Sequence, residues 1–137
     1  MTIETKIRES FAKQAMMSSL HAKLILVGDG CVQIQAPILP AFTQQHDFAH
    51  AGVTFSLGDS AAGYAALTLM DENAEVLTAE MKINLLAPAK GDVLVATGKV
   101  IRPGKRLMVV TATVEAVTGN DRQDIAILQG TMVPVYR

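Results

Sequence analysis

One carboxylate, Asp59, lies in the middle of a segment that otherwise carries no charge. The segment is Ala51–Met70, AGVTFSLGDSAAGYAALTLM, and its other side chains are apolar, small or hydroxyl-bearing. An ionised carboxylate among such side chains costs free energy unless another group pairs with it or hydrogen-bonds it. A chemical role is the simplest reason to keep Asp59 there, as a general base or a nucleophile. The structural alternative is that it caps a neighbouring helix or pairs with Lys82.

The start of the same segment offers donors to a negatively charged oxygen. The first N–H groups of a helix have no partner inside it, and the helix dipole is positive at that end. In a helix that begins after His50, these amides belong to Ala51 and Gly52. Ala51 and Asp59 would then lie about 12 Å apart along the axis, whereas reacting atoms must approach to about 3–3.5 Å. If both residues act on one carbonyl, a second chain must supply one of them.

A basic turn is the best candidate for binding an anion. Arg102, Lys105 and Arg106 surround the dipeptide Pro103-Gly104, and cationic side chains beside a glycine suit a phosphate. Exposed charges in a turn also occur in proteins without any ligand, so both interpretations stay open.

Potential metal ligands occur just before the long segment, at His46, Asp47 and His50. A fourth ligand and a recognised ligand spacing are lacking, so no metal site is predicted. His50 could act as a catalytic acid or hold the loop at the helix start. The single cysteine, Cys31, excludes a disulfide framework and an all-thiolate metal site.

Length and composition restrict the class of protein. The 137 residues are enough for one domain, expected to span residues 1–137, and half of them are hydrophobic. A net charge of −1 gives no indication of binding to nucleic acid or to an anionic membrane. The start of the chain has no signal-peptide core, and the central charge of Ala51–Met70 opposes a membrane span. These observations predict a cytoplasmic protein.

Periodicity and turn residues indicate the elements that position these groups. Apolar residues at helical spacing predict a short first helix capped by Thr2, and Ala51–Met70 predicts a long one. Between them, His21–Val27 and Cys31–Ile38 predict a hairpin, followed by a polar loop over Ala41–Ala49. The later strands are expected at Glu80–Leu85, Val93–Ile101, Leu107–Val117 and Ile125–Val135.

Six strands and one long internal helix predict an α+β fold with an antiparallel sheet. Because the helix is apolar on all its faces, a flat sheet on one side would leave apolar surface in water. The sheet must therefore curl around the helix, or a second subunit must cover what remains.

Two stretches carry a resemblance to a known family. His50-Ala51-Gly52 followed by Leu57-Gly58-Asp59-Ser60-Ala61-Ala62 resembles the HGG…LxDxA signature of hotdog-fold acyl-CoA thioesterases of the phenylacetate-pathway (PaaI) type. Met81–Ala89 is similar to the third strand of that family and the turn after it. The resemblance spans Val27 to Val135 and implies a hotdog fold, in which a curved six-stranded antiparallel sheet wraps around one central helix.

The resemblance also implies a reaction, the hydrolysis of an acyl-CoA without a metal or redox cofactor. Asp59 would be the general base or nucleophile, and the amide of Ala51 in the partner subunit would hold the oxyanion, because these enzymes pair their central helices in dimers. Gln44 would orient the reactants. The remaining residues expected to contact substrate or assist are His50, Gly52, Asn84, Arg102, Gly104, Lys105 and Arg106, the basic ones at the CoA phosphates. A homodimer or homotetramer is expected.

The chain departs from the family pattern at several positions. Ala51 replaces the first glycine after the histidine, and Gln44 stands where an asparagine is common. A hydroxyl that positions water in some members falls at Ala87, for which Thr68, Asn84 and Ser60 are candidate replacements. A non-catalytic acyl-CoA-binding module therefore stays an alternative. A hotdog hydratase or dehydratase is another, although the expected acid and histidine motif is absent.

Overall fold

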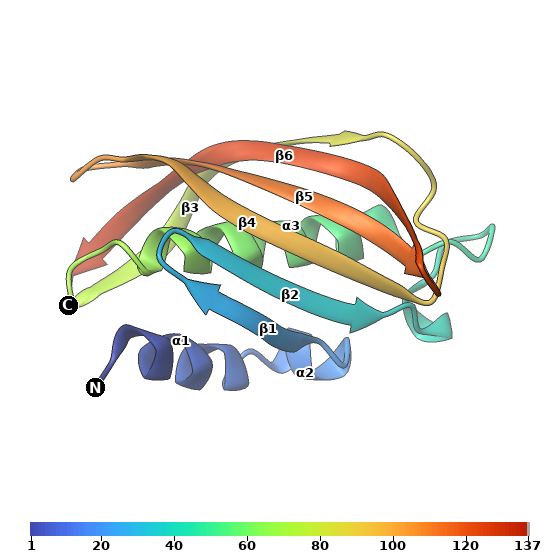
Figure 1. Cartoon of the computed structure of the whole chain (residues 1–137), viewed down its shortest axis with the longest axis horizontal. Helices are drawn as coiled ribbons and strands as arrows, with labels where there is room; N and C mark the ends of the chain where they lie inside the picture. Colours follow the sequence, from blue (N-terminus) through green and yellow to red (C-terminus); the bar gives the residue numbers. More distant parts are fainter. Residues whose placement is uncertain (137) are drawn as a thin grey trace.

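The computed structural model describes residues 1–136, and Figure 1 labels its elements. In chain order they are α1 (Ile3–Ala12), α2 (Ala15–Ser19), β1 (Lys23–Gly28), β2 (Cys31–Pro37), a 3₁₀ turn η1 (Pro40–Phe42), α3 (Ala51–Leu67), β3 (Ala74–Leu85), β4 (Val93–Pro103), β5 (Met108–Thr118) and β6 (Asp121–Tyr136). The predicted first helix, hairpin, loop, long helix and later strands are all present. The largest difference is β3, which begins six residues earlier than predicted.

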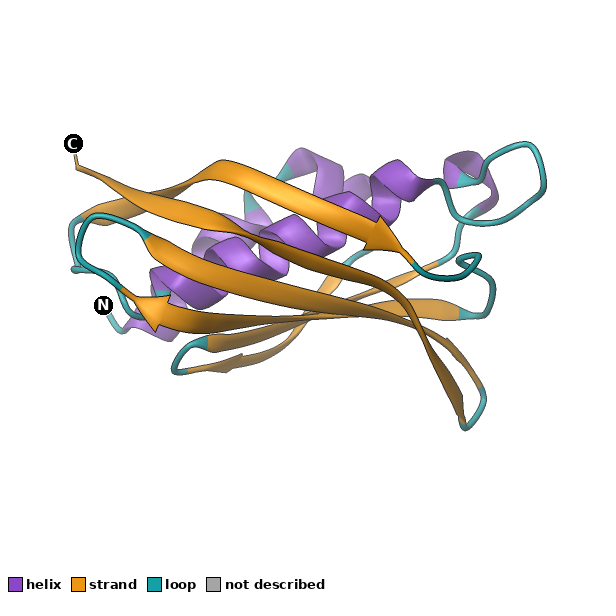
Figure 2. Ribbon diagram, turned by 90° about the horizontal axis from the view of Figure 1, so that it is seen from above, coloured by secondary structure: helices purple, strands orange, loops and turns teal. Residues whose placement is uncertain are grey.

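The six strands form one antiparallel sheet in the order β1-β2-β4-β5-β6-β3. The edge strands are therefore β1 and β3. In Figure 2 the sheet curves around α3, with the N-terminal helices beside it. This arrangement confirms the predicted fold class, a curved sheet wrapped around one long helix.

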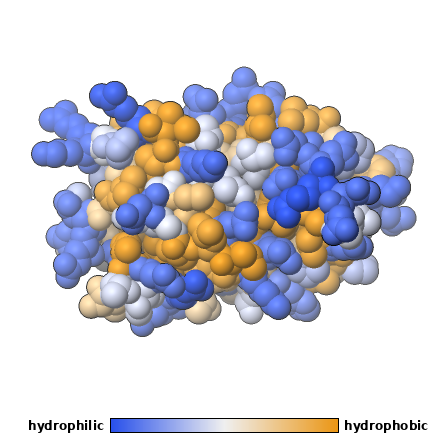
Figure 3. Space-filling model, viewed as in Figure 1, coloured by the Kyte–Doolittle hydropathy of each residue, from blue (hydrophilic) through white to orange (hydrophobic). Residues whose placement is uncertain are grey.

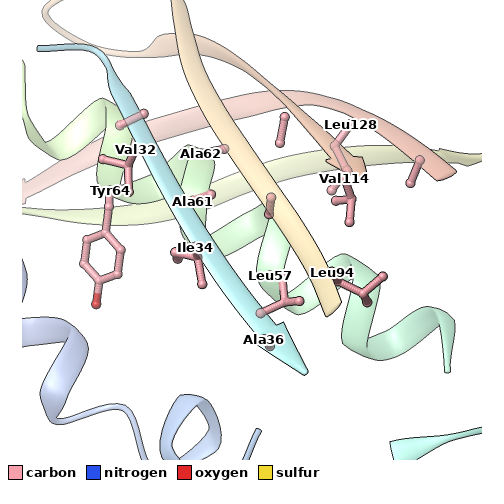
Figure 4. Packing of buried hydrophobic residues seen from close by; sticks show 14 of the residues in the cluster. Val32, Ile34, Ala36, Leu57, Ala61, Ala62, Tyr64, Leu94, Val114 and Leu128 are labelled. Atoms are coloured by element: carbon pink, nitrogen blue, oxygen red, sulfur yellow. The ribbon is translucent and has the colours of Figure 1, made fainter. Parts of the chain in front are cut away.

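The core lies between the sheet and α3. Along β2, residues alternate between buried and half-buried, so that one face of the strand packs on the helix. The neighbouring strands contribute their inward residues in the same way, as the alternation of β5 shows. Figure 4 shows this packing, in which the labelled residues include Val32, Ile34, Ala36, Leu57, Ala61, Leu94, Val114 and Leu128.

One close approach holds α3 against the sheet. A Cβ atom on Gly98 of β4 would lie 2.3 Å from the carbonyl carbon of Ala61, nearer than two such atoms can come. Only glycine leaves room for the helix backbone at this point. The distance between α3 and β4 is therefore set by contact between two backbones.

The chain covers α3 on the sheet side and leaves a stripe of it partly open. Eleven of its 17 residues are buried, whereas Phe55, Ser56, Asp59 and Ser60 are only half-buried. These positions follow helical spacing, so they lie on one face. One chain therefore does not bury α3 on all sides, as its apolar sequence predicted. Asp59 lies on the open stripe rather than in the core.

The outer face of the sheet mixes polar and apolar side chains (Figure 3). Inward and outward residues alternate along β5, so Val109, Thr111 and Thr113 lie on this outer side and are half-buried. Among residues 1–136, no helix combines the length and apolar character needed to cross a membrane.

Candidate active site

The Asp59 carboxylate is held from the neighbouring strand. Thr78 of β3 donates a hydrogen bond from Oγ1 to Oδ1 of Asp59, over 2.7 Å. Within residues 1–136, Oδ2 of Asp59 has no hydrogen-bond or ion-pair partner. The carboxylate therefore has one fixed oxygen and one available oxygen. Lys82, the alternative partner considered from the sequence, lies on the outer face of β3 opposite Gln129 and does not pair with Asp59.

Thr78 reaches Asp59 because β3 starts at Ala74. Thr78 is paired with Met132 of β6 on the inner face of the sheet, and its hydroxyl also lies 3.3 Å from the sulfur of Met132. The register shifts between Thr78 and Glu80, which marks a β-bulge at the end of this stretch. Thr78 was not predicted as a site residue. Its spacing from Asp59 carries no local signal, because the two residues meet only through the pairing of β3 with the sheet.

Asp59 and Thr78 open onto a groove of about 280 Å³ between α3 and β3. The other residues that line it come from three further parts of the chain and from α3 itself: Ser10, Gln14, Ser60, Gly63, Tyr64, Leu67, Glu75, Val76 and Met132. The first twenty residues, which lie outside the resemblance noted in the sequence, thus contribute two polar side chains to the groove.

His50 is the N-cap of α3. Its Nδ1 accepts a hydrogen bond of 2.8 Å from the Gly52 amide, and the ring is exposed. A Cβ atom on residue 52 would lie 3.0 Å from that nitrogen, so a glycine two residues after the histidine leaves room for the ring. The structure therefore favours the interpretation in which His50 holds the start of the helix. The same hydrogen bond occupies the Gly52 amide, which was predicted from the sequence to be free for substrate.

The Ala51 amide is the free donor at the start of α3. The amides of Val53 and Thr54 point to the His50 carbonyl oxygen, at 2.9 and 3.4 Å, and the Gly52 amide is taken by the His50 ring. Within residues 1–136, the Ala51 N–H has no acceptor. A single uncommitted N–H at a helix N-terminus can bind an oxyanion.

The side chain of Gln44 hydrogen-bonds to the backbone of its own loop, just before α3. Its Oε1 accepts from the backbone amides of His46 and Phe48, at 2.5 and 3.4 Å. The side-chain NH₂ of Gln44 has no acceptor among residues 1–136. Gln44 can therefore donate a hydrogen bond to a bound molecule, but its oxygen is already occupied.

These groups belong to a second depression, separate from the Asp59 groove. It measures about 540 Å³, and its lining includes Gln44, His50 and Ala51 from the helix start, together with Gln45, Phe48, Ala49, Thr54, Leu85, Leu86, Ala87, Pro88, Ala89 and Ile125. No residue lines both depressions. One chain therefore keeps Asp59 apart from Ala51 and Gln44, as the length of the helix predicts.

The candidates for the water-positioning hydroxyl lie elsewhere. Asn84 is paired with Ile127 on the outer face of the sheet, so within one chain it lies apart from the groove of Asp59. Its contact with substrate stays a prediction. Thr68 is used at the end of α3, where its hydroxyl donates to the Ala65 carbonyl and accepts from the Gly30 amide. Ser60 does line the groove. The hydroxyl that touches the carboxylate is that of Thr78.

The basic turn lies between β4 and β5, at the opposite end of the sheet from the loop that leads into α3 (Figure 1). Gly104 and Lys105 share a depression of about 340 Å³ with Leu69 and Asp71, just after α3. Within residues 1–136 the ion pairs are Arg8–Glu4 and Arg122–Glu115. Arg102, Lys105 and Arg106 are therefore exposed cations without an ionic partner in the described chain.

No group of three or more histidine, cysteine, aspartate or glutamate side chains that could hold a metal occurs in residues 1–136. The candidate ligands His46, Asp47 and His50 therefore do not converge on one point.

Comparison with known proteins identifies the family and the fold. Residues 46–122 match the family model described as the thioesterase superfamily. A solved thioesterase family protein from Silicibacter pomeroyi is 40% identical, with a TM-score of 0.96 over 98% of this chain and 99% of that chain. The E. coli PaaI protein from the phenylacetic acid degradation operon shares the fold, with a TM-score of 0.85, 22% identity and coverage of 97% and 93%.

A Saccharolobus solfataricus protein, whose name provisionally calls it an esterase, is 34% identical over 105 residues, which are 76% of this chain and 74% of that protein. The predicted resemblance is confirmed, and the chain belongs to the thioesterase superfamily with the hotdog fold.

Proposed function

We propose that this protein hydrolyses acyl-CoA thioesters to a free acid and CoA, with Asp59 as general base or nucleophile. The observation that carries the proposal is the position of Asp59 on the open stripe of α3, with Oδ1 held by Thr78. Its Oδ2, which has no partner in residues 1–136, is left to take a proton or to attack a carbonyl carbon. Membership of the thioesterase superfamily supports the same class of reaction.

In the general-base route, Oδ2 of Asp59 takes a proton from water as the water oxygen attacks the thioester carbonyl carbon. The carbonyl electron pair moves to the oxygen, and that anion accepts a hydrogen bond from the Ala51 amide. The C–S bond then breaks, and the leaving sulfur takes the proton from Asp59. In the nucleophilic route, Oδ2 of Asp59 attacks the carbonyl carbon, the C–S bond breaks and CoA leaves as its thiolate. Water then hydrolyses the mixed anhydride to the free acid and regenerates the Asp59 carboxylate, and the proton released passes to the thiolate. Both routes consume one water molecule and need no cofactor.

The proposed site combines two copies of the chain. Asp59 and Ala51 line different depressions, so one copy would supply the carboxylate and the other the amide. A twofold axis near Phe55, midway in the sequence between the two residues, would place Ala51 of the partner subunit opposite Asp59. The edge strand β3 supports such pairing, because an edge strand offers unpaired backbone groups and its Leu77 and Leu85 are 57% and 55% exposed.

The other proposed contacts follow from the groups left available. The NH₂ of Gln44 would donate to the substrate beside Ala51, and since its Oε1 is already bonded to the loop, Gln44 would not act as a base. Lys105, Arg106 and Arg102 would hold the CoA phosphates. Two dimers could associate through the outer faces of their sheets as a homotetramer. We place the protein in the cytoplasm.

The test is CoA release from phenylacetyl-, benzoyl- and straight-chain acyl-CoAs, for wild type and Asp59→Asn. We expect the variant to lose turnover by about a thousandfold or more while the fold, measured by circular dichroism, is unchanged. Asp29→Asn is the matched control, because it removes an exposed carboxylate in the turn between β1 and β2 that lines none of the depressions at Asp59, Ala51 or the basic turn, and it should keep wild-type turnover. Saturable acyl-CoA binding without hydrolysis would contradict the proposal and favour the binding module.

A further inference from the structure

The segment before β1 closes one end of the Asp59 groove, although the family match begins only at residue 46. Ser10 of α1 and Gln14 just after it both line the groove, and both contact the hydroxyl of Tyr64 on α3. Gln14 Nε2 donates to Tyr64 Oη over 2.8 Å. Ser10 Oγ lies 3.0 Å from the same oxygen, with either atom as donor.

These contacts hold the Tyr64 ring in one position. The residue is 5% exposed, and Phe11 packs edge-on against it with the ring centres 6.3 Å apart and the planes at 61°. An edge-to-face pair and two hydrogen bonds on one hydroxyl leave the ring little freedom to turn away. Tyr64 is therefore a fixed part of the groove wall.

The groove beyond Asp59 has a mixed polar and apolar lining, with room for a short acyl chain. Tyr64 is five residues further along α3, about 7.5 Å along the helix axis. Leu67 and Met132, which are 1% and 0% exposed, also line the groove, and apolar groups gain free energy by leaving water against such side chains. The groove has a volume of about 280 Å³, and no residue of the basic turn lines it. It fits the acyl part of a thioester rather than the charged CoA part.

A larger depression adjoins the groove. It measures about 910 Å³, and its lining includes α1 and the connection from α3 to β3. The two depressions share only Ser10 and Glu75. Ser10, which contacts Tyr64, and Glu75 therefore lie where the small groove at the carboxylate adjoins the larger depression.

We propose that Tyr64, held in place by Ser10 and Gln14, limits the length of the acyl group, so that the enzyme acts on short-chain acyl-CoAs. This proposal rests on the thioesterase function proposed for Asp59 and adds the substrate class. An acyl chain that enters past Asp59 ends at the Tyr64 ring. A longer chain has to displace the ring or bend back toward water.

The test is the dependence of kcat/KM on acyl length, measured with butanoyl-, hexanoyl-, octanoyl- and dodecanoyl-CoA. For wild type we expect kcat/KM to fall by about tenfold or more between hexanoyl- and dodecanoyl-CoA. Tyr64→Ala removes the ring and makes room for the methylene groups of a longer chain. Because one or two methylene groups in a hydrophobic pocket are worth tenfold or more, the kcat/KM values for hexanoyl- and dodecanoyl-CoA should then differ by no more than about threefold.

A second variant is needed in case Tyr64→Ala does not fold, because replacing a buried aromatic residue by alanine lowers the free energy of unfolding by about 3–5 kcal/mol. The double variant Ser10→Ala/Gln14→Ala keeps the Tyr64 ring and removes both hydrogen-bond partners of its hydroxyl. Alanine suits position 10 inside α1, and Gln14, which precedes α2, makes no side-chain cap bond that would be lost. The double variant should shift the length dependence in the same direction as Tyr64→Ala, by a smaller factor. Arg8→Ala is the matched control, since Arg8 is an exposed residue of α1 that lines neither depression.

The outcomes separate the two proposals. If wild type releases CoA from no substrate, the proposed function is wrong and the limit on acyl length is wrong with it. If wild type is active but Tyr64→Ala and the double variant keep its length dependence, the role of Tyr64 alone is overturned. A changed length dependence in Arg8→Ala would also overturn it, because the effect would then come from α1 as a whole.

Discussion

Thr78 and Asp59 are 19 residues apart in the sequence, and the hydroxyl of the first donates to the carboxylate of the second over 2.7 Å. The contact joins the edge strand β3 to the open stripe of α3. It turns one carboxylate oxygen toward β3 and so determines which oxygen is left to act on a bound molecule.

Replacing Thr78 by valine removes this donor and keeps the shape of the side chain. We expect kcat to fall by about tenfold to a hundredfold, because a misplacement of a reacting group by about 1 Å can cost about a hundredfold. Thr78→Ser restores the hydroxyl and should restore most of the activity. Steady-state CoA release measures both, and equal rates for Thr78→Val and wild type would show that the contact is only structural.

Ala51→Pro tests whether the site is shared between subunits. Proline has no N–H, yet it is favoured at the first position of a helix, and His50 already has the extended backbone (φ −58°, ψ 141°) that a following proline requires. Ala51→Pro and Asp59→Asn should each lose activity as homodimers. Mixed dimers, made by co-expression in equal amounts, should regain about a quarter of wild-type sites, because half of the dimers are mixed and each has one intact site.

If both residues act within one chain, mixing the two variants restores nothing. The same preparations, passed over a sizing column, report whether Ala51→Pro has disturbed assembly.

His50→Ala and His50→Asn separate capping from acid catalysis. Alanine removes the acceptor of the Gly52 amide and should lower the free energy of unfolding by about 1 kcal/mol. Asparagine is a preferred N-cap and should keep both stability and turnover. Urea titration and CoA release give the two readouts. A stable His50→Asn protein without activity would show that the imidazole itself takes part in the reaction.

Gly98→Ala tests the contact between the α3 backbone and β4. The added methyl group would overlap the Ala61 carbonyl, so we expect a loss of about 3 kcal/mol or more in the free energy of unfolding. Lys99→Thr, an exposed position next to it on the same strand, should change stability by less than about 0.5 kcal/mol. Urea titrations of the two variants check this, and similar midpoints would mean that α3 can move away from the sheet.

The double variant Lys105→Ala/Arg106→Ala tests the proposed phosphate contacts. Both side chains are exposed, so their contribution is screened by salt, and we expect KM for an acyl-CoA to rise by about tenfold with kcat unchanged. Lys23→Ala, at an exposed position on the edge strand β1, is the control. An unchanged KM for a CoA ester would remove the basic turn from the site.

The sequence was informative where local patterns decide the structure. The alternation in β2, the glycine turn before it and the apolar run of α3 are local features, and each predicted its element. Helix geometry also predicted that Asp59 and Ala51 would be separated, because the rise per residue does not depend on the rest of the fold.

The first half of β3 shows why other parts could not be predicted. In Glu75-Val76-Leu77-Thr78 the polar residue Thr78 points inward to Asp59, while Leu77 is 57% exposed. This reverses the usual alternation of a strand with one buried face, and a β-bulge follows. The partnership of Ser10 and Gln14 with Tyr64 was hidden for a related reason, since it joins residues 50 or more positions apart.

The contact between Gly98 and Ala61 also limits how this protein can change over evolution. Where two backbones touch, no substitution can add or reshape a side chain without separating the elements, so the sheet side of α3 offers little freedom to acquire a new substrate. Inherited or laboratory changes in preference are then confined to the other side of the helix, around Ser60 and Tyr64, and to α1. Homologues that keep the same strands should therefore differ most in this short N-terminal part.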